Sequence, residues 1–551
     1  MYDVIIVGGG GAGIMAAVAA AESGARTAII CKEPVGYGNT RMAVGLTSCA
    51  AVDNDTREQF IEDILISGEG LSNRDLVETL ADDSREAVSS LEQLGHIFVR
   101  NKNGMLSGDA ILRSGGHSIA RTLQSSGKGI GMGQVLRSAT EKHKIDRIED
   151  TLALSLIVDA GRVCGVQVLD LASSLEYSLS ANAVVLATGG GGWLFYPQTT
   201  NNRGACGDGY VLAYQAGAKL MDMEQIQAVP FGLTRPAAYR GLICGEPSTA
   251  GPEGRILDGE GNVVLEKGIN RLGRATVVQA MAAPILEGRT TADGSLLLDL
   301  EPNLHTSEGL LHREHTRATG ITEIVLTAYG KKAYNWEEPW KVLPTIHFFM
   351  GGIDVGKDTK SDIPNLFAAG EVMGGVHGGN RLGSVALTEI LVFGLRAGRA
   401  AAEYAKNNNV RREASPAKRQ SALLGSSGKN RPIELCHKLQ AIMWQYAGLT
   451  RSREGLQTAL DSVAELKKEA QDLRIGSETI YNTELRDAVE LNFMLESALL
   501  VLNAALLREE SRGAHIRSDF PQNGGPNWEK NILLWKDEYG KAVHTLREAR
   551  K

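Results

Sequence analysis

The chain has 551 residues, 43% of them hydrophobic and 22% charged, and its 58 basic and 65 acidic side chains give a formal net charge of −7. This mild acidic balance argues against nucleic-acid binding, and a chain of this length can build a large core without disulfide or metal staples. Glycine is abundant with 64 residues, whereas aromatic residues make up only 5%. This composition indicates tight turns and close approach of the backbone to a ligand.

A dinucleotide-binding βαβ unit is predicted at the N-terminus. Residues 4–7 form a short apolar run typical of a buried parallel strand, a helical stretch rich in alanine follows, and residues 27–30 predict a second strand. Between the first strand and the helix, Gly8, Gly10 and Gly13 fit the pattern GxGxxG. These glycines permit a tight turn, close approach to a pyrophosphate at the helix N-terminus and close packing of helix on strand.

Two later strand ends bear on the kind of dinucleotide. One predicted strand ends at Thr188 and Gly189, and another, late in the chain, ends at Glu371. Contacts at the start, middle and end of a chain resemble the FAD-binding flavoproteins related to glutathione reductase, in which Glu371 would accept hydrogen bonds from the ribityl chain; the alternative is an exposed strand-end glutamate. Glu33 is a candidate for the ribose hydroxyls, and a plain surface glutamate is an equal alternative.

The elements together predict an α/β fold with a Rossmann-like FAD-binding domain in two parts, residues 1–232 and 343–405. Residues 233–342 lack the βαβ rhythm and predict an inserted α+β capping domain that closes over the flavin. Residues 406–432 are polar, basic and rich in turn formers, which predicts a linker. Residues 433–551 predict a C-terminal helical domain.

The cysteines and the apolar runs indicate where the chain works. The six cysteines are Cys31, Cys49, Cys164, Cys206, Cys244 and Cys436. They show no CxxC or zinc spacing, so we expect no metal or iron–sulfur site in this chain and a reducing compartment. No run reaches the ~20 continuous apolar residues of a membrane span, and no signal peptide is expected before the first strand. We therefore expect a cytoplasmic protein that reaches a membrane only through a partner.

Several motifs resemble those of the flavoprotein subunits of succinate dehydrogenase and fumarate reductase, in the same order and over nearly the whole chain. They are NTRMA at 39–43, GDG at 207–209, DME at 222–224, HFFMGGI at 347–353, HGGNRLG at 377–383 and ESRGAH at 510–515. The resemblance implies an FAD-dependent oxidoreductase that interconverts an enoate and its saturated acid by hydride transfer at flavin N5 and proton transfer from an arginine. The FAD contacts that it implies are Gly8, Gly10, Gly13, Lys32, Asn39, Thr40, Thr188, Gly189, Asp208, Glu371, Arg381 and Ser384.

Three residues are implied to carry the chemistry. Arg381 and His347 are similar to the family's carboxylate-binding pair, and an arginine fork can hold a carboxylate through two hydrogen bonds. Arg274 lies in GRATVV, which looks like the family's GRDVVAR, and would be the proton donor in reduction and the acceptor in oxidation. The alternatives are a surface ion pair for Arg274, a satisfied core histidine for His347 and a buried structural ion pair for Arg381.

Some positions depart from the family pattern. Asn39 replaces the histidine that tethers the flavin in covalently linked members, and His117 lies elsewhere in the chain, so we expect non-covalent FAD. Val229 and Phe231 replace a histidine and a threonine, and a carboxylate at the far end of the substrate would lose charged hydrogen bonds worth about 1.5–3 kcal/mol each. The substrate could therefore be an acid other than fumarate. The end of that acid far from the clamped carboxylate would be apolar or aromatic, or would be held by a different residue.

The proton relay must differ from that of the family. The electron carrier is expected to lie outside this chain. Ala275 follows Arg274 where the family has an aspartate. Glu246 and Glu253 are both relay candidates, and a loop carboxylate is the alternative for each. With no clustered cysteines and no CxxCH, electrons require an iron–sulfur partner subunit or a diffusible donor, and the C-terminal helical region favours the partner. Two alternatives stay open, an enzyme resembling L-aspartate oxidase and a non-catalytic FAD electron-relay subunit of a larger complex.

Overall fold

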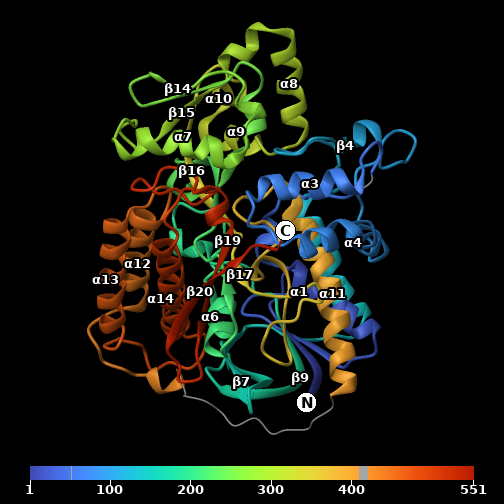
Figure 1. Ribbon diagram of the computed structural model, residues 1–551, viewed down its shortest axis with the longest axis vertical. Helices are drawn as coiled ribbons and strands as arrows, with labels where there is room; N and C mark the ends of the chain where they lie inside the picture. The colour runs from blue at the N-terminus through green and yellow to red at the C-terminus, as the bar shows by residue number, and fades with distance from the viewer. Residues whose placement is uncertain (51, 409–419, 551) are drawn as a thin grey trace.

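The computed structural model describes residues 1–50, 52–408 and 420–550 (Figure 1). Its central layer is a seven-stranded sheet in the order β6-β2-β1-β9-β8-β7, with β18 also paired to β9. The strands are β1 (Tyr2–Val7), β2 (Thr27–Ile30), β6 (Asp146–Ile148), β7 (Thr151–Asp159), β8 (Arg162–Asp170), β9 (Glu176–Leu186) and β18 (Leu366–Ala368). The β6, β2, β1, β9 and β18 pairings are parallel, whereas β7 and β8 continue the sheet in antiparallel pairings next to β9. This sheet confirms the predicted α/β class.

Two helices pack together against this sheet, and Figure 1 shows them side by side. They are α1 (Gly11–Glu22) and α11 (Val385–Asn407). Small residues allow the close approach, because a Cβ at Gly398 would lie 2.1 Å from the carbonyl oxygen of Ala16. The packing brings residues 343–405, the second segment of the predicted FAD-binding part, back onto the N-terminal βαβ unit. Residues from both segments of this part therefore meet at the carboxyl ends of β1 and β18.

Smaller elements surround this layer. They are α2 (Asn39–Met42), β3 (Leu46–Ser48), α3 (Arg57–Ser67), α4 (Arg74–Gln93), β4 (Ile111–Leu112), β5 (Thr122–Gln124), α5 (Lys128–Lys142) and α6 (Asp208–Gln215). Strands β3, β5 and β4 form a three-stranded antiparallel sheet.

A second body with its own hydrophobic core, drawn in green in Figure 1, lies at one end of the molecule. Its sheet has the order β12-β11-β16-β15-β13-β14. The elements are β11 (Ile226–Leu233), β12 (Ile243–Gly245), β13 (Arg255–Leu257), β14 (Val263–Leu265), α7 (Arg274–Leu286), β15 (Leu296–Asp299), α8 (Ser307–Ala318), α9 (Glu323–Tyr329), α10 (Lys331–Tyr334) and β16 (Trp340–Phe349). The long strands β11 and β16 pair antiparallel and connect this body, which we call the cap, to the FAD-binding part.

The C-terminal region begins with three mutually packed helices, α12 (Pro432–Ala447), α13 (Arg453–Glu469) and α14 (Thr483–Leu507). It ends in a hairpin of β19 (Lys530–Lys536) and β20 (Ala542–Glu548), which the helical pattern of the sequence does not indicate. Strand β19 pairs with β10 (Leu220–Met221), which in turn pairs with β17 (Gly352–Ile353), so the hairpin joins the FAD-binding part. Part of the predicted linker, residues 409–419, lies outside the described residues.

Helix α14 is, within the described ranges, the one helix long and apolar enough to span a membrane by length and composition. Of its most apolar 18-residue window, 72% is buried inside the protein. Its apolar side chains therefore pack in the core that it forms with α12 and α13.

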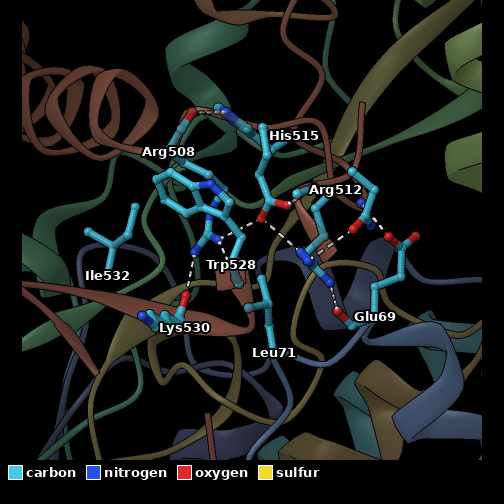
Figure 2. Close-up of polar contacts among 12 residues, drawn as sticks. Glu69, Leu71, Arg508, Arg512, His515, Trp528, Lys530 and Ile532 are labelled. Atoms are coloured by element: carbon cyan, nitrogen blue, oxygen red, sulfur yellow. Dashed lines mark hydrogen bonds and ion pairs between the residues drawn. The ribbon is translucent and has the colours of Figure 1, made fainter. Parts of the chain in front are cut away.

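A buried ionic network joins the DME and ESRGAH segments. Arg508 is fully buried, donates from Nε to Glu224 at 2.6 Å and pairs with Asp222 and Glu510 at 3.2 and 3.1 Å. Figure 2 shows Arg508 reaching the Lys530 carbonyl and Arg512 reaching Glu69. Arg512 also donates from Nε to Glu510 at 2.8 Å. Neither segment lines the cavity beside the glycine turn or the larger cavity that adjoins it, so both segments hold the C-terminal region against the predicted FAD-binding part.

Candidate active site

The glycine turn after β1 is shaped by packing. Gly8 has φ +118°, and a Cβ there would lie 2.2 Å from the Ala187 carbonyl oxygen. A Cβ at Gly13 would lie 2.0 Å from the oxygen of Gly8, so α1 packs directly on the turn. A Cβ at Gly10, by contrast, would meet no described atom closer than 3.9 Å, and Gly10 lines a cavity of about 150 Å³. The turn thus has one open side, where a helix N-terminus and backbone amides meet the cavity.

The walls of this smaller cavity suit a dinucleotide. Thr188 Oγ1 is buried and has no hydrogen-bond partner among the described residues, and a Cβ at the neighbouring Gly189 would meet none of their atoms within 4 Å. Lys32 lines the cavity with its Nζ 3.0 Å from Oδ2 of Asp208, and Glu33 lines it while accepting from Asn202 at 3.1 Å. The residues present therefore fit an FAD pyrophosphate and ribose, with an unused hydroxyl and open backbone facing the ligand.

A larger cavity of about 1240 Å³ adjoins the first, since Asn39, Thr40 and Glu371 line both. Asn39 is held on both sides of its amide: Nδ2 donates to Asn201 at 2.6 Å and Oδ1 accepts from the Asn202 amide at 2.9 Å. Thr40 Oγ1 accepts from the amide of Gly11 at 3.2 Å. These bonds fix α2 against the glycine turn, so the loop lies where the two cavities meet.

Glu371 and Ser384 lie at the same junction. Glu371 accepts from the Phe349 amide at 3.0 Å, and burial raises the pKa of its carboxyl to about 7. A buried carboxyl at this place can accept hydrogen bonds from ligand hydroxyls. Ser384 precedes α11 with φ +66°, and its Oγ lies 2.7 Å from Oγ of Ser114; both serines line the larger cavity.

Arg381 is a buried cation in the wall of the larger cavity. Only 4% of the residue is exposed, its Nη1 donates to the Leu382 carbonyl at 3.2 Å, and its Nε has no partner among the described residues. The guanidinium carbon lies 4.8 Å from the centre of the Phe348 ring. Burial and the nearby Arg274 lower the pKa of Arg381 to about 9, which leaves it charged at pH 7. Because no carboxylate of the described residues forms an ion pair with it, this buried guanidinium is prepared to receive an anion.

His347, on β16, lies beside this cation. Its Nδ1 is 2.7 Å from Oγ1 of Thr200, and the residue lines the larger cavity. Burial, together with the positive charges of Arg381 and Arg274, holds the pKa of His347 well below its ordinary value. The imidazole is therefore neutral at pH 7 and available as a hydrogen-bond partner inside the cavity.

Arg274, the first residue of α7, presents the second guanidinium. Its Nε and Nη2 donate to the two oxygens of Glu246 at 2.8 and 2.5 Å, and its Nη1 donates to Oε1 of Gln227 at 2.7 Å. Gln227 in turn donates to the Arg381 carbonyl at 2.8 Å, so one amide links the backbone of one arginine to the side chain of the other. Glu253 does not line the cavity and lies 3.9 Å from Lys267. The geometry therefore places Glu246, not Glu253, beside Arg274.

Two residues expected near the substrate lie elsewhere. Val229 and Phe231 are fully buried, and Phe231 belongs to the core of the cap. Neither lines the larger cavity, because β11 turns both side chains into the packing against neighbouring elements. The cap side of the cavity is formed instead by other residues, which sequence patterns did not single out: Leu242, Ile243, Ser248, Thr249, His312 and His315.

His117 lies under the loop that carries Ser384, and it makes the stability of the protein depend on pH. Its Nε2 is 2.8 Å from the Gly383 carbonyl, which can only accept, so Nδ1 accepts from Arg121 at 2.9 Å and the ring is neutral. Burial and Arg121 lower the pKa of His117 to about 4, against the Gly383 hydrogen bond, which raises it.

As pH falls below the ordinary value of 6.5, the unfolded chain takes up a proton at His117 that the native protein does not, so stability is lost by about 1.4 kcal/mol per pH unit down to about pH 4. We expect His117→Gln to remove this loss, so that the fall in unfolding free energy between pH 7.5 and pH 5 shrinks by about 2 kcal/mol in urea titrations. His544→Gln, on the exposed strand β20, is the control and should follow the wild type. An unchanged pH dependence in His117→Gln would show that this histidine does not titrate as described.

Comparison with known proteins shows the family of the chain. The family model described as "FAD binding domain" matches residues 3–387, and that described as "Fumarate reductase flavoprotein C-term" matches residues 436–549. One subunit of the fumarate reductase (CoM/CoB) of Methanothermobacter marburgensis is 34% identical over 97% of this chain and 96% of its own length. The fumarate reductase flavoprotein subunit of Haemophilus influenzae is 31% identical over 98% and 92%.

Solved structures give the same result. A variant of E. coli quinol fumarate reductase FrdA has a TM-score of 0.88 at 29% identity and covers 100% of this chain and 97% of its own. The Mycobacterium smegmatis Sdh1 complex in the apo form has a TM-score of 0.87 at 30% identity, with coverage of 100% and 94%. The fold and the glycine-lined cavity define an FAD-dependent oxidoreductase. The chain belongs to the fumarate reductase and succinate dehydrogenase flavoprotein family.

Proposed function

We propose that the protein interconverts an enoate and its saturated carboxylic acid in the larger cavity. The observation that carries the proposal is Arg381, a buried cation that lines the cavity and forms no ion pair with a carboxylate of the described residues. A substrate carboxylate would supply the missing partner through two charge-assisted hydrogen bonds. His347 and Arg274 line the same cavity, so the acid would lie between two guanidinium groups and one neutral imidazole.

The three side chains share two tasks, which are holding the acid and moving a proton. Bound FAD supplies the hydride acceptor or donor. Arg381 and His347 would hold the substrate carboxylate and stabilise the negative charge that develops toward the α-carbon. Arg274 would give a proton to that carbon in reduction and take one from it in oxidation. One hydride and one proton thus add across the double bond, and both leave in the reverse direction.

Glu246 and Gln227 prepare Arg274 for this role. Guanidinium groups release protons reluctantly, so a guanidinium that acts as an acid needs a nearby group that returns the proton. Glu246 makes the fork-to-fork contact that permits such a return, and Gln227 fixes the third nitrogen. We propose Glu246 as the relay carboxylate.

The side chains on the cap side of the larger cavity, including Thr249 and His312, would contact the rest of the acid. This extends the proposal to acids other than fumarate.

We further propose that FAD is bound without a covalent bond. Asn39 occupies the loop position of the tethering histidine, and its amide cannot form that link. Among the described residues, no cysteine lines the larger cavity. We expect acid precipitation of the yellow protein to leave all flavin in the supernatant and a colourless pellet. Flavin that stays with the pellet, or a flavin-bearing peptide after proteolysis, would contradict this expectation.

We propose that electrons enter and leave the flavin through a carrier outside the described residues. Among the described residues there is no group of three or more His, Cys, Asp or Glu side chains that could hold a metal ion. The relatives from M. marburgensis and H. influenzae are both named as subunits of fumarate reductases. We propose that an iron–sulfur protein docks on this one as its partner and exchanges electrons with the flavin.

The proposal is tested with the chemically reduced holoenzyme under anaerobic conditions. Enoates such as fumarate, acrylates and cinnamates are added singly, and reoxidation of the flavin absorbance is followed together with the saturated product. We expect at least one enoate to reoxidise the flavin with stoichiometric product, while saturated acids do not. Failure of every enoate together with peroxide formation from L-aspartate in air would support the oxidase alternative and overturn the proposal.

A further inference from the structure

A cluster of buried charges joins the wall of the smaller cavity to the C-terminal helix α14. The Nζ atom of Lys32 lies 3.0 Å from Oδ2 of Asp208 and 3.3 Å from Oε1 of Glu490. The side chains of these three residues are 12, 11 and 4% exposed. Lys32 and Asp208 line the cavity, whereas Glu490 stands one layer behind them on α14. A residue of the C-terminal region thus completes the ion pair of a residue in the cofactor pocket.

Glu490 is itself held firmly. Arg486, one helical turn earlier, donates from Nε to Oε1 of Glu490 at 3.2 Å, and Arg203 lies 3.7 Å from the other carboxylate oxygen. Burial alone would raise the pKa of Glu490, but Lys32 and Arg486 lower it below its ordinary value. Burial would likewise lower the pKa of Lys32, and Asp208 and Glu490 raise it above the ordinary value. The pair is therefore ionised in the native protein.

A second contact from the same helix holds the residue that precedes Asp208. The hydroxyl of Ser497 donates to the Gly207 carbonyl at 3.1 Å. A Cβ at Gly207 would lie 2.4 Å from the Ser497 Oγ atom. Gly207 has φ +76° and directly precedes Asp208, the first residue of α6. Figure 1 shows α14 alongside α6. Helix α14 thus fixes both the turn before Asp208 and the charge opposite it.

We propose that Glu490 is a positioning residue of the FAD site, and that FAD binding and the docking of α14 stabilise each other through Lys32. Removing one partner from a buried ion pair leaves an uncompensated charge and destabilises the remaining geometry. Without Glu490, Lys32 would lose one of its two carboxylate partners. The wall of the cofactor pocket would then lose its fixed shape. Because coupling between two binding events is reciprocal, FAD must strengthen the docking of α14 to the same extent. The inference rests on the fit of FAD to this pocket and does not depend on the acid that is reduced.

The test compares Glu490→Gln with Glu496→Gln, both isosteric and both on α14. Glu496 pairs with Lys467 at 2.5 Å and is 30% exposed, and it does not line the cavity. The holoenzymes are diluted, and the recovery of flavin fluorescence gives the apparent dissociation constant of FAD. We expect Glu490→Gln to raise this constant at least tenfold and Glu496→Gln to leave it within twofold. Equal effects of the two variants, or none in Glu490→Gln, would overturn the proposal.

A second measurement uses the wild type as its starting point. Amide hydrogen exchange of residues 483–497 is compared in FAD-saturated and FAD-depleted protein, with residues 453–469 of α13 as the internal reference. We expect FAD to slow exchange in the first segment and not in the second, and Glu490→Gln to abolish the difference. Exchange in α14 that does not respond to FAD would overturn the coupling. A Lys32→Met background provides a further check, since Glu490→Gln should then have little additional effect on the FAD constant.

Discussion

Replacing Arg274 with glutamine is expected to lower the turnover of the enoate by about 10²–10⁴-fold while the protein keeps its full FAD content. A positioned proton donor contributes this much to a reaction, and glutamine preserves a hydrogen-bonding side chain without a proton that it can transfer. The hydrogen bonds of Glu246 and Gln227 with Arg274 would be lost, but neither residue lines the FAD pocket proper, the smaller cavity. The measurement is the rate at which an enoate reoxidises the reduced enzyme in a single turnover, which excludes electron delivery from the result.

The matched control is Arg255→Gln. Arg255 is another arginine of the cap and donates to Asp299 at 2.9 Å, but it does not line the larger cavity. Its variant should keep the wild-type rate within about twofold. A rate for Arg274→Gln within tenfold of the wild type would show that the proton comes from another group. If the activity of a whole complex that contains this variant were unchanged as well, the electron-relay alternative would gain support.

Replacing Arg381 with glutamine is expected to remove most of the binding of the acid. Two charge-assisted hydrogen bonds at about 1.5–3 kcal/mol each correspond to a loss on the order of 10²–10⁴ in affinity for the acid. Arg381→Lys keeps the charge without the fork and should recover only part of the loss. Binding is followed through the perturbation of the flavin spectrum by a saturated acid, so that the result does not depend on turnover.

Arg113→Gln serves as the comparison for charge alone. Arg113 lines the same cavity and donates to the His117 carbonyl at 2.8 Å, but it has no place in the proposed clamp. We expect its variant to bind the acid nearly as the wild type does. Similar losses in both arginine variants would mean that the acid senses the general positive potential of the cavity and not a specific clamp.

The parts of the fold that local patterns encode can be predicted from the sequence. The strand, glycine turn and helix at residues 2–22 and the strand ending before Glu371 lie where their hydrophobic runs predict them. The family motifs also indicate Arg274, His347 and Arg381, and the structure brings all three to one cavity. Such features depend on residues close together in the chain, or on motifs long enough to be recognised.

The remaining features depend on contacts between distant segments. Gln227 lies two residues before Val229, but its bonds to Arg274 and to the Arg381 carbonyl follow from the pairing of β11 with β16 and from the position of the cap. The hairpin β19–β20 follows a helical region and is stabilised by a strand far earlier in the chain, Leu220–Met221. Val229 illustrates the opposite error, because a motif position alone does not reveal which way its side chain points.

The most direct test is a crystal structure of the FAD-loaded enzyme with a saturated acid bound, the product of an enoate that it reduces. We expect the carboxylate to accept two hydrogen bonds from Arg381, with the imidazole of His347 within hydrogen-bonding distance. The carbon next to the carboxylate should then face a nitrogen of Arg274. An acid bound away from these side chains, with the Arg381 guanidinium still lacking an anionic partner, would contradict the assignment of this cavity as the place where the carbon–carbon bond is reduced.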